Sequence, residues 1–430
     1  MRENRGIGFV KWLIGGSWKR AFLLLFLAVC CALIVLGALH GSPDLQSAPA
    51  PRTPLAPLTP TFPPRHSDPT PVPPLVRGVP ARPHLYPHAA TTDLTLGSTS
   101  AFVVDHARSA LFTPDPRYVA QDTLTDTGPG LPGPLSGLPT RPDLASRRPI
   151  AVVVENYAPD ARPQAGLNRA SLVFETLAEG GITRFLAVYL EKDAPIVGPV
   201  RSARIYFDSW AAGLGAIFAH AGGNNDALAE LPYIPSIDNI DGLGALGTAF
   251  WRASDRYAPH NFYTSTALIR AVAGTGPAPA LPVLIHKAPA SLAARPKGGW
   301  IDIPFSAPDY EVRYTFDPLC DCYPRFMGGV AHRDAYSQRQ IAPANVVVLF
   351  APVVPDPNSD TPGSISVGTI GTGQAYFFRD GRETQGTWRK DSQAAALQLL
   401  DAQGRPVAFN PGQTWIEVPS VGTAVSWSPT

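Results

Sequence analysis

Two arginines flank a serine in the segment Gly198–Arg204, which reads GPVRSAR. Apolar and aromatic residues follow at helical spacing, so we predict a helix whose first turn is capped by Ser202. Arg201 and Arg204 then crowd the positive end of the helix dipole, where each cation is unfavourable by roughly 0.3–1 kcal/mol. Backbone amides and guanidinium groups together bind phosphate or carboxylate well. The segment therefore predicts an anion beside Arg201 and Arg204, either a ligand or a carboxylate of the same domain.

Glu175 and Glu179 are the candidate carboxylates upstream of these arginines. On a helix, a separation of four residues places both on one face, close enough to raise one pKa for general acid–base catalysis. On a strand they lie about 13 Å apart and do not couple. Arg184 follows closely and can pair with either. A salt-bridge role and an acid–base role are therefore both open.

Two histidines stand at expected loop positions. His220 ends an apolar run and precedes Gly222 and Gly223, and ligands of open α/β sheets gather beyond the carboxyl ends of strands. His260 and Asn261 lie in a second loop ahead of a predicted helix. We therefore count all five among the candidate site residues, with a hydrogen-bonded structural role as the alternative for His220.

Beyond the proline-rich stretch, residues 136–430 contain no recognised spacing for metal ligands or nucleotides. They have no His-x-x-x-His, Cys-x-x-Cys, EF-hand, glycine-rich or Gly-x-Ser-x-Gly motif, so we expect neither a metal nor a cofactor. Cys320 and Cys322 are separated by one residue, which in a strand puts their Cα atoms about 6.6 Å apart. That distance is at the loose end of disulfide geometry. A ring this tight would be strained, so two free thiols or partners elsewhere are open.

An uncharged apolar run, Ala21–Leu39, lies near the amino terminus. As a helix it spans roughly 28 Å, about the thickness of a bilayer's hydrocarbon core. Five basic residues precede it against Glu3 alone, so we predict a single-pass anchor with residues 1–20 in the cytoplasm and the bulk outside. Lipidation at Cys30 and ordinary cleavage are the alternatives.

Residues 40–135 are rich in proline, which fixes φ and removes a backbone donor. This composition predicts a disordered, polyproline-II-rich stalk rather than a fold. The formal net charge of +1 gives no electrostatic reason to expect a nucleic acid partner. The predicted partners are therefore the membrane and an anionic component of the envelope.

Beyond the stalk, the pattern predicts two domains. An α/β domain at residues 136–290 is indicated by apolar strands alternating with a helical stretch that includes Tyr206 and Ile217. A mostly β domain follows at 295–430, with Ser392–Leu400 as its only helical segment. The strands expected in the first domain are Ile150–Val154, Phe185–Leu190 and Ala216–His220. Those expected in the second are Trp300–Phe305, Tyr310–Phe316, Asn345–Phe350, a Gln374–Arg379 and Glu383–Arg389 hairpin turning at Asp380–Gly381, and Thr414–Val418.

Several long motifs resemble the bacterial YerB-like family, which is catalogued as a domain of unknown function with amino- and carboxy-terminal parts. The first part carries RPIAVVVENYAPDARPQAGLNRASLVFETLAEGGITRFLAVYLE, GPVRSAR, HAGG and APHNFYTS; the second carries YPRFMGGVAHRD, GTGQAYFFRDG, GTWRK and GQTWIEVPS. The resemblance covers roughly Gly137–Val418. It implies an envelope protein, often a lipoprotein, and it transfers no activity and no catalytic residue.

Three hypotheses for function follow. The first is an anchored extracytoplasmic protein that binds an anionic envelope ligand around Arg201 and Arg204. The second is a hydrolase or transferase acting on an envelope polymer, with Glu175 or Glu179 as the acid–base group and a histidine assisting. The third is a structural scaffold of the envelope.

Overall fold

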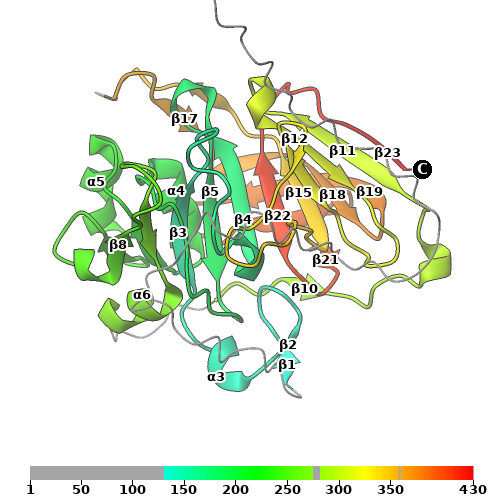
Figure 1. Cartoon of the computed structure of the whole chain (residues 1–430). Helices are drawn as coiled ribbons and strands as arrows, with labels where there is room; N and C mark the ends of the chain where they lie inside the picture. Colours follow the sequence, from blue (N-terminus) through cyan, green and yellow to red (C-terminus); the bar gives the residue numbers. More distant parts are fainter. Residues whose placement is uncertain (1–129, 275–280, 358, 360, 430) are drawn as a thin grey trace, which may run out of the picture. The chain divides into compact units, whose positions relative to one another are not determined.

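A ten-stranded sheet dominates the computed structural model, which describes residues 130–274, 281–357, 359 and 361–429 (Figure 1). Its strand order is β20-β19-β18-β15-β22-β4-β5-β3-β6-β7. The predicted anchor and most of the predicted stalk lie outside the described residues. Within the described part, no helix has the length and apolar character needed to cross a membrane. We call residues 130–274 the amino-terminal half and residues 281–429 the carboxy-terminal half.

Five strands of the large sheet come from the amino-terminal half. They are β3 (Ile150–Glu155), β4 (Leu172–Leu177), β5 (Thr183–Tyr189), β6 (Ile217–His220) and β7 (Asp238–Asp241). All residues of β3 and β5 are buried, which is why their sequences read as continuous apolar runs instead of alternating. The three strands predicted here are confirmed.

The other five strands come from the carboxy-terminal half. They are β15 (Asn345–Leu349), β18 (Gly371–Arg379), β19 (Arg382–Lys390), β20 (Gln398–Asp401) and β22 (Thr414–Val418). The predicted hairpin is confirmed as β18 and β19, and its turn residues Asp380 and Gly381 have φ angles of 53° and 70°. The parallel pair of β22 and β4, with Ile416 opposite Phe174, joins both halves into one sheet.

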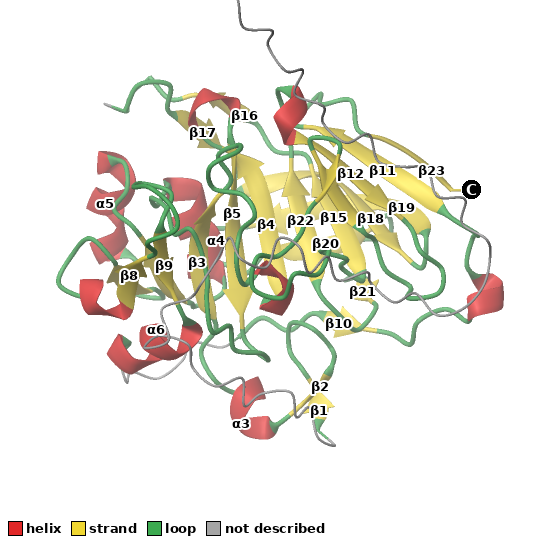
Figure 2. Ribbon diagram, in the orientation of Figure 1, coloured by secondary structure: helices red, strands yellow, loops and turns green. Residues whose placement is uncertain are grey.

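Helices cover one face of the large sheet (Figure 2). The helix α4 (Ile205–Gly213) is buried along most of its length, and its Trp210 stacks on Phe174 of β4 with ring centroids 5.0 Å apart. The short helix α5 (Asn225–Glu230) packs beside α4 and is capped by Asn224. Together they bury the even-numbered side chains of β6, such as Phe218.

A five-stranded antiparallel sheet packs against the other face of the large sheet. Its strands, in spatial order, are β14 (Val330–Ala331), β13 (Arg325–Met327), β12 (Glu311–Thr315), β11 (Gly299–Pro304) and β23 (Ser426–Pro429). In β12 exposed and buried residues alternate, as the sequence predicted for a half-exposed strand. Ile303 and Tyr314 of this sheet share a core with Val173 and Trp415 of the large sheet.

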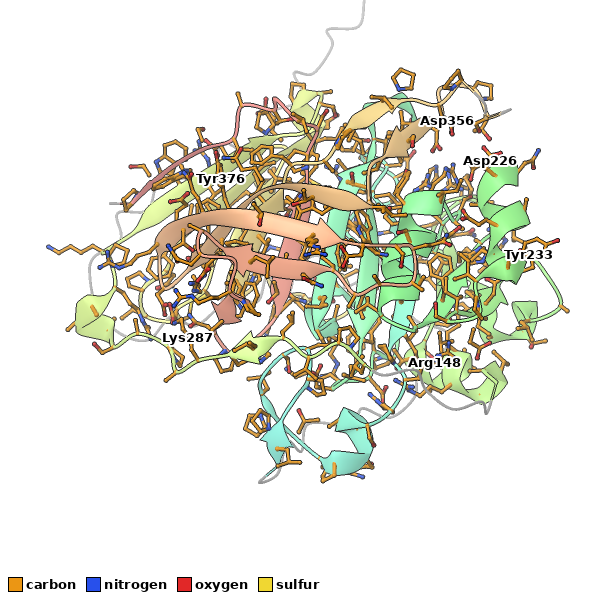
Figure 3. All side chains as sticks on the ribbon, turned by 180° about the vertical axis from the view of Figure 1, so that it is seen from behind. Arg148, Asp226, Tyr233, Lys287, Asp356 and Tyr376 are labelled. Carbon is orange, nitrogen blue, oxygen red and sulfur yellow. A yellow bond between two sulfur atoms is a disulfide. The ribbon has the colours of Figure 1, made fainter. Side chains whose placement is uncertain are left out.

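The remaining described elements are short. The strand pairs are β1 (Leu131–Pro132) with β2 (Pro139–Thr140), β8 (Phe250–Arg252) with β9 (Phe262–Thr264), β10 (Ile285–His286) with β21 (Ala408–Phe409), and β16 (Val353–Pro355) with β17 (Ile365–Val367). The helices are α3 (Pro142–Ala145) and α6 (Thr266–Val272). Lys287, labelled in Figure 3, follows β10 and binds Asp380 at 2.5 Å and Asn410 at 2.7 Å. These contacts fasten the segment between the halves to the β18–β19 turn.

The overall class is confirmed: the amino-terminal half is mixed α/β and the carboxy-terminal half is mostly β. Three local predictions are wrong. The residue that caps α4 is Arg204 rather than Ser202, and no side chain accepts a hydrogen bond there. Ile217 begins β6 instead of ending the helix, because Gly215 with φ of 59° terminates it. Ser392–Leu400 is not helical, and its end belongs to β20.

Cys320 and Cys322, whose pairing the sequence left open, form a disulfide. The extended geometry assumed for the segment does not hold, because Asp321 between them has a φ of 54°. This left-handed residue brings the two Cα atoms to 5.2 Å.

Candidate functional site

The loop that carries Gly198–Arg204 lies between the carboxyl ends of β3 and β6. The amide of Arg201 donates to Val153 O at 2.9 Å, and its carbonyl accepts from Ala221 N at 3.0 Å. The amide of Ala203 donates to Gly222 O at 2.8 Å, which the φ of 61° at Gly222 makes possible. The predicted loops therefore do meet at the carboxyl ends of β3 and β6. We call the charged residues gathered there the rim cluster: Glu155, Glu179, Arg184, Arg201, Arg204 and His260.

Glu155, the last residue of β3, organises one side of the rim cluster. It is buried, and its Oε1 receives Arg201 Nε at 2.9 Å and His260 Nδ1 at 3.0 Å. The ring of His260 also stacks on Tyr157, with centroids 5.2 Å apart. Because one carboxylate oxygen holds both groups, Glu155 fixes the position of Arg201 at the surface.

Glu179 organises the other side. Its Oε1 accepts from Arg204 Nε, and its Oε2 lies 3.6 Å from Arg184 Nη2. Burial opposes ionisation of Glu179, but the Arg204 hydrogen bond and the Arg184 charge outweigh it and lower the pKa. Arg184 Nη1 also donates to Ser202 O at 3.0 Å. The carboxylate of the same domain that was expected to pair with Arg204 is therefore Glu179, which follows β4 in a short turn.

The rim cluster contains more positive than negative charge. Burial, together with the neighbouring charges of Arg204 and Arg201, lowers the pKa of Arg184 to about 10. Three guanidinium groups face two carboxylates, so one positive charge is not balanced within the cluster. Arg201 is the arginine nearest to solvent, with its side chain 29% exposed against 10% and 8% for Arg184 and Arg204.

Arg201 is also the arginine of the rim cluster whose guanidinium has the fewest contacts. Its Nε lies 2.9 Å from Glu155 Oε1 as an ion pair, and its side chain makes no hydrogen bond to any described residue. Two parallel N–H groups on a guanidinium match the two oxygens of a carboxylate or phosphate. The geometry of the rim cluster therefore fits an anion bound at Arg201.

The other predicted site residues shape the rim rather than line it. His220 is fully buried, with Nδ1 2.8 Å from Gly222 O and Nε2 2.7 Å from Asn239 Oδ1. Asn261 donates to Ala253 O at 2.9 Å and accepts from Arg252 at 2.8 Å, which holds the loop that carries His260. Ser202 contributes its carbonyl oxygen to Arg184, and Gly223 forms a bridge with Ala203.

Glu175 lies outside the rim cluster, in a second and fully buried set of charged residues. We call this set the buried cluster: Glu175, Tyr314, Arg325, His332 and Glu417. Arg325 donates to Glu175 Oε2, to Tyr314 Oη at 3.0 Å and to His332 Nδ1, and its Nε lies 3.6 Å from Glu417 Oε1. Its guanidinium also lies over the Trp415 ring, 4.4 Å from the centroid. The buried cluster thus connects β4, β22 and the five-stranded sheet.

Burial sets the protonation states in this cluster. It raises the pKa of Glu417 well above its usual value, and the charge of Glu175 raises it further. Burial and then the charge of Arg325 hold the pKa of His332 well below its usual value, so the ring is neutral. Its Nδ1 accepts from Arg325, and its Nε2–H donates to Gln164 Oε1 at 2.9 Å. Arg325 therefore pairs more closely with Glu175 than with Glu417, whose raised pKa favours its protonated form.

The acid–base arrangement predicted from the sequence is not assembled. Glu175 lies on the face of β4 that contains Val173, whereas His220 lies on the face of β6 that contains Phe218. These faces belong to opposite sides of the sheet. Glu179 is neutralised by Arg204 and Arg184. Glu175 and His220 therefore do not meet in a cleft, and Glu175 has no exposed surface.

The sequence interpretation misses Glu155 and most of the buried cluster. It ends the predicted strand at Val154, directly before Glu155, although a carboxylate that follows an apolar run at a predicted site is itself a signal. Arg325 and His332 share the motif YPRFMGGVAHRD, but Tyr314 and Glu417 lie in other segments, so no local pattern identifies the four as a group. Within the described part of the chain, no three metal-ligating side chains are grouped closely enough to hold an ion.

Two family models match this architecture. "Protein of unknown function (DUF3048) N-terminal domain" matches residues 135–277, and the corresponding C-terminal domain matches residues 301–416. The chain therefore belongs to the DUF3048 family, as the resemblance in its motifs predicted. It is 33% identical over 304 residues to "Putative lipoprotein YerB" of Bacillus subtilis (strain 168), which covers 69% of this chain and 89% of that relative. A crystal structure of YerB protein from Bacillus subtilis matches with a TM-score of 0.62 and 32% identity, covering 69% of this chain and 99% of that one.

Proposed function

We propose that this chain is an extracytoplasmic envelope protein that binds an anionic ligand at Arg201. The observation that carries the proposal is the guanidinium of Arg201, which lies beside Glu155 as an ion pair and makes no hydrogen bond to any described residue. A fixed guanidinium loses little conformational entropy when it binds a carboxylate or phosphate. The excess positive charge of the rim cluster favours the same ligands.

Tyr157 indicates what carries the anion. It stacks on His260, which shares Glu155 with Arg201, and Tyr157 remains 40% exposed. An exposed aromatic ring linked to a guanidinium through a shared carboxylate offers an apolar surface near an anion site, which suits a sugar ring bearing a phosphate or carboxylate. We therefore propose an anionic saccharide polymer of the envelope as the ligand class.

The location has two supports. A similar protein of Bacillus subtilis carries the word lipoprotein in its name. In this chain, the apolar run Ala21–Leu39 follows a basic segment, which favours a single-pass anchor with the bulk of the chain outside. Acylation at Cys30 is the alternative form of attachment, and both place residues 40–430 outside the cytoplasm.

Isothermal titration of the full chain in detergent tests the ligand. The probes are inorganic phosphate, glucose 6-phosphate and glucuronate, with glucose as the neutral probe. We expect the charged sugars to bind more tightly than phosphate and glucose not to bind. Arg201→Gln should weaken charged-sugar binding at least tenfold, because it removes the charge and the paired donors.

Arg389→Gln is the matched control, because Arg389 is an exposed arginine paired with Asp391 far along the sheet on β19. It removes the same charge and should leave binding unchanged. Equal losses in both variants would mean that the protein's general charge, and not the rim cluster, attracts the anion. Unchanged binding in Arg201→Gln would refute the site.

The attachment is tested separately. Protease added to intact, wall-stripped cells should cut the proline-rich segment and release a soluble fragment that contains both family domains. Protection of that fragment until the membrane is permeabilised would contradict an extracytoplasmic location.

A further inference from the structure

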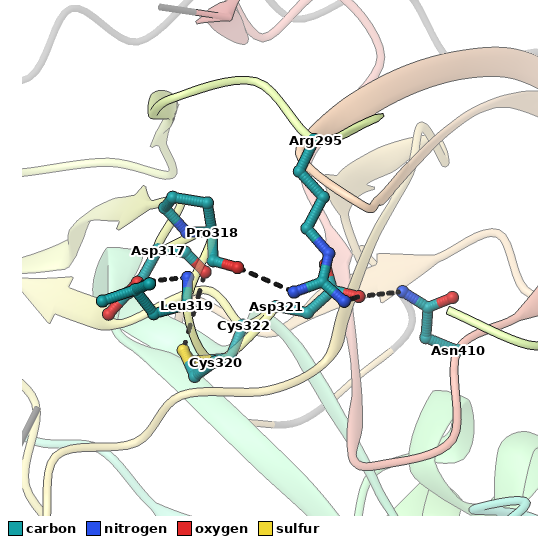
Figure 4. The surroundings of a disulfide bond; sticks show 8 residues. All are labelled: Arg295, Asp317, Pro318, Leu319, Cys320, Asp321, Cys322 and Asn410. Carbon is teal, nitrogen blue, oxygen red and sulfur yellow. Dashed lines mark hydrogen bonds and ion pairs between the residues drawn. A yellow bond between two sulfur atoms is a disulfide. The ribbon is translucent and has the colours of Figure 1, made fainter. Parts of the chain in front are cut away.

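The disulfide of the carboxy-terminal half lies in a tight turn between β12 and β13 (Figure 4). The turn is closed by backbone hydrogen bonds between Asp317 and Cys322, with Asp317 N 3.0 Å from Cys322 O. Cys320 is exposed at the tip of the turn, whereas Cys322 is 7% exposed. The two sulfurs therefore differ in their access to a reagent from solvent.

This disulfide contributes little to holding the turn. A cross-link stabilises a fold mainly by closing a loop of the unfolded chain, and a separation of two residues closes almost none. Other bonds already fix the turn: Leu319 N donates to Asp317 Oδ1 at 2.8 Å, and Arg295 Nη1 donates to Pro318 O at 2.7 Å. A structural purpose therefore does not account for the bond.

A polar pocket of about 350 Å³ lies beside the disulfide. Both cysteines, Asp321, Arg295 and Asn410 line it. Asp321 Oδ2 receives Arg295 at 3.3 Å and Asn410 at 3.1 Å, but the buried Oδ1 has no hydrogen-bond partner among the described residues. An unpaired buried acceptor is unfavourable until a donor reaches it. A peptide N–H entering the pocket next to the sulfurs would supply that donor.

We propose that Cys320–Cys322 is a reactive disulfide that oxidises a dithiol on an extended peptide. A peptide thiolate attacks the exposed sulfur of Cys320, the bond between the two cysteines breaks, and Cys322 leaves as a thiolate that takes up a proton. The second peptide thiolate then attacks the peptide's own sulfur in the mixed disulfide and releases Cys320. Two electrons pass from the peptide dithiol to Cys320 and Cys322, and no other oxidant is required for this single turnover.

The access of the two sulfurs decides the direction of attack. Exposed disulfides exchange more readily than buried ones, and the rate depends on which sulfur is reached. Cys320 is reachable from solvent, while Cys322 is covered by the turn and its neighbours. After exchange the turn keeps its backbone hydrogen bonds and the Arg295 contacts, so the fold should survive reduction.

The test uses the full chain carrying Cys30→Ser and Cys31→Ser in detergent. It is incubated with a reduced synthetic peptide containing Cys-x-x-Cys, quenched by alkylation and weighed by mass spectrometry. We expect one peptide to be oxidised per chain, with the melting temperature of the reduced protein within about 5 °C of the oxidised form. A disulfide that resists excess peptide, or that is reduced only with loss of the fold, would overturn the proposal.

Two single-cysteine variants identify the attacked sulfur. Each variant is mixed with a one-cysteine peptide whose thiol carries a thionitrobenzoate group as a mixed disulfide. Attack by the protein thiol releases coloured thionitrobenzoate, and its absorbance gives the rate. Cys322→Ser, which keeps the exposed Cys320, should form the mixed disulfide at least tenfold faster than Cys320→Ser, which keeps the buried thiol. Equal rates would contradict attack at Cys320. If either variant fails to fold, oxidation of the peptide by the wild-type cysteine pair still decides the proposal.

Discussion

The rim cluster and the buried cluster contain the same kinds of charged group but differ in what these groups do. Each contains arginine, glutamate and histidine, and each joins segments far apart in the chain. In the buried cluster each guanidinium nitrogen of Arg325 has a hydrogen-bond partner, and its side chain is 0% exposed. In the rim cluster Arg201 is 29% exposed, and its side chain makes no hydrogen bond to any described residue. Charged residues of one composition therefore hold the fold where they are buried and are available to a ligand where they are not.

The difference also appears in the protonation states. Burial raises the pKa of Glu417 well above its usual value, which leaves the buried cluster with one cation and one anion. In the rim cluster Glu179 keeps a lowered pKa, because its arginines outweigh burial. The buried cluster is thus neutral overall, whereas the rim cluster keeps a positive charge. A neutral interior and a charged edge are what a binding site built on a stable sheet requires.

The largest expected effect separates the two clusters by stability. Arg325→Met should lower the free energy of unfolding by about 3–5 kcal/mol, because it leaves the buried Glu175 without its cation. Urea unfolding of the full chain, followed by tryptophan fluorescence, measures it. An unfolding free energy within about 1 kcal/mol of the wild type would mean that the buried cluster is not a stabilising contact, and the comparison would fail.

Asp208 gives an intermediate effect next to the rim cluster. It lies in the first turn of α4, is buried, and neither carboxylate oxygen has a hydrogen-bond partner among the described residues. Burial and then the charge of Glu230 raise its pKa from 3.8 to about 8, although Arg204 opposes the shift. The folded state therefore binds more protons than the unfolded state, and stability falls as pH rises between about 4 and 8.

Asp208→Asn should remove that slope and stabilise the protein at pH 8 by about 2 kcal/mol or more. Thermal and urea unfolding at pH 5 and pH 8 measure the change. Parallel stability profiles for the wild type and the variant would show that Asp208 does not titrate across this range. The prediction sharpens the comparison, because it would show that burial affects the pKa of Asp208 more than the nearby charge of Arg204 does.

The smallest expected effect is on the rim itself. Arg201→Met, the same substitution as at Arg325, should change the free energy of unfolding by less than about 1 kcal/mol. Its partner Glu155 keeps the contact with His260, and the side chain of Arg201 is partly in water. The same urea experiment measures it. A loss as large as that of Arg325→Met would show that Arg201 is a structural residue and would weaken its assignment to binding.

Local patterns in the sequence are enough to predict the strands and the turn. Ile150–Val154 and Asn345–Phe350 are apolar runs because both faces of the sheet are covered, and Asp380–Gly381 supplies the positive φ that its hairpin needs. The convergence of Arg201, Arg204 and His260 is also predictable, because loops at the carboxyl ends of neighbouring strands meet. The strand and turn predictions rest on residues close in sequence, whereas the convergence follows from a general rule about open sheets.

Long-range pairing is beyond local patterns. Thr176 Oγ1 donates to Val418 O across a separation of 242 residues, and no periodicity in either segment predicts that β4 and β22 are neighbours. The buried cluster depends on the same pairing, since it brings Glu175 and Glu417 side by side in the sheet. The helix predicted at Ser392–Leu400 is wrong for a related reason: its alanines favour a helix, but β19 pairs with its end.

The place of β22 between β4 and β15 also sets the order in which the chain can fold. As the chain is synthesised, β3, β4 and β5 emerge long before Thr414–Val418, and until then β4 presents an unpaired strand edge. That edge is closed only after β22 has left the ribosome. Contacts of this separation form slowly, so the nascent amino-terminal half is open to wrong strand partners throughout the synthesis of the carboxy-terminal half. A chaperone that covers the edge of β4 during this interval would raise the yield of folded protein without changing the native structure.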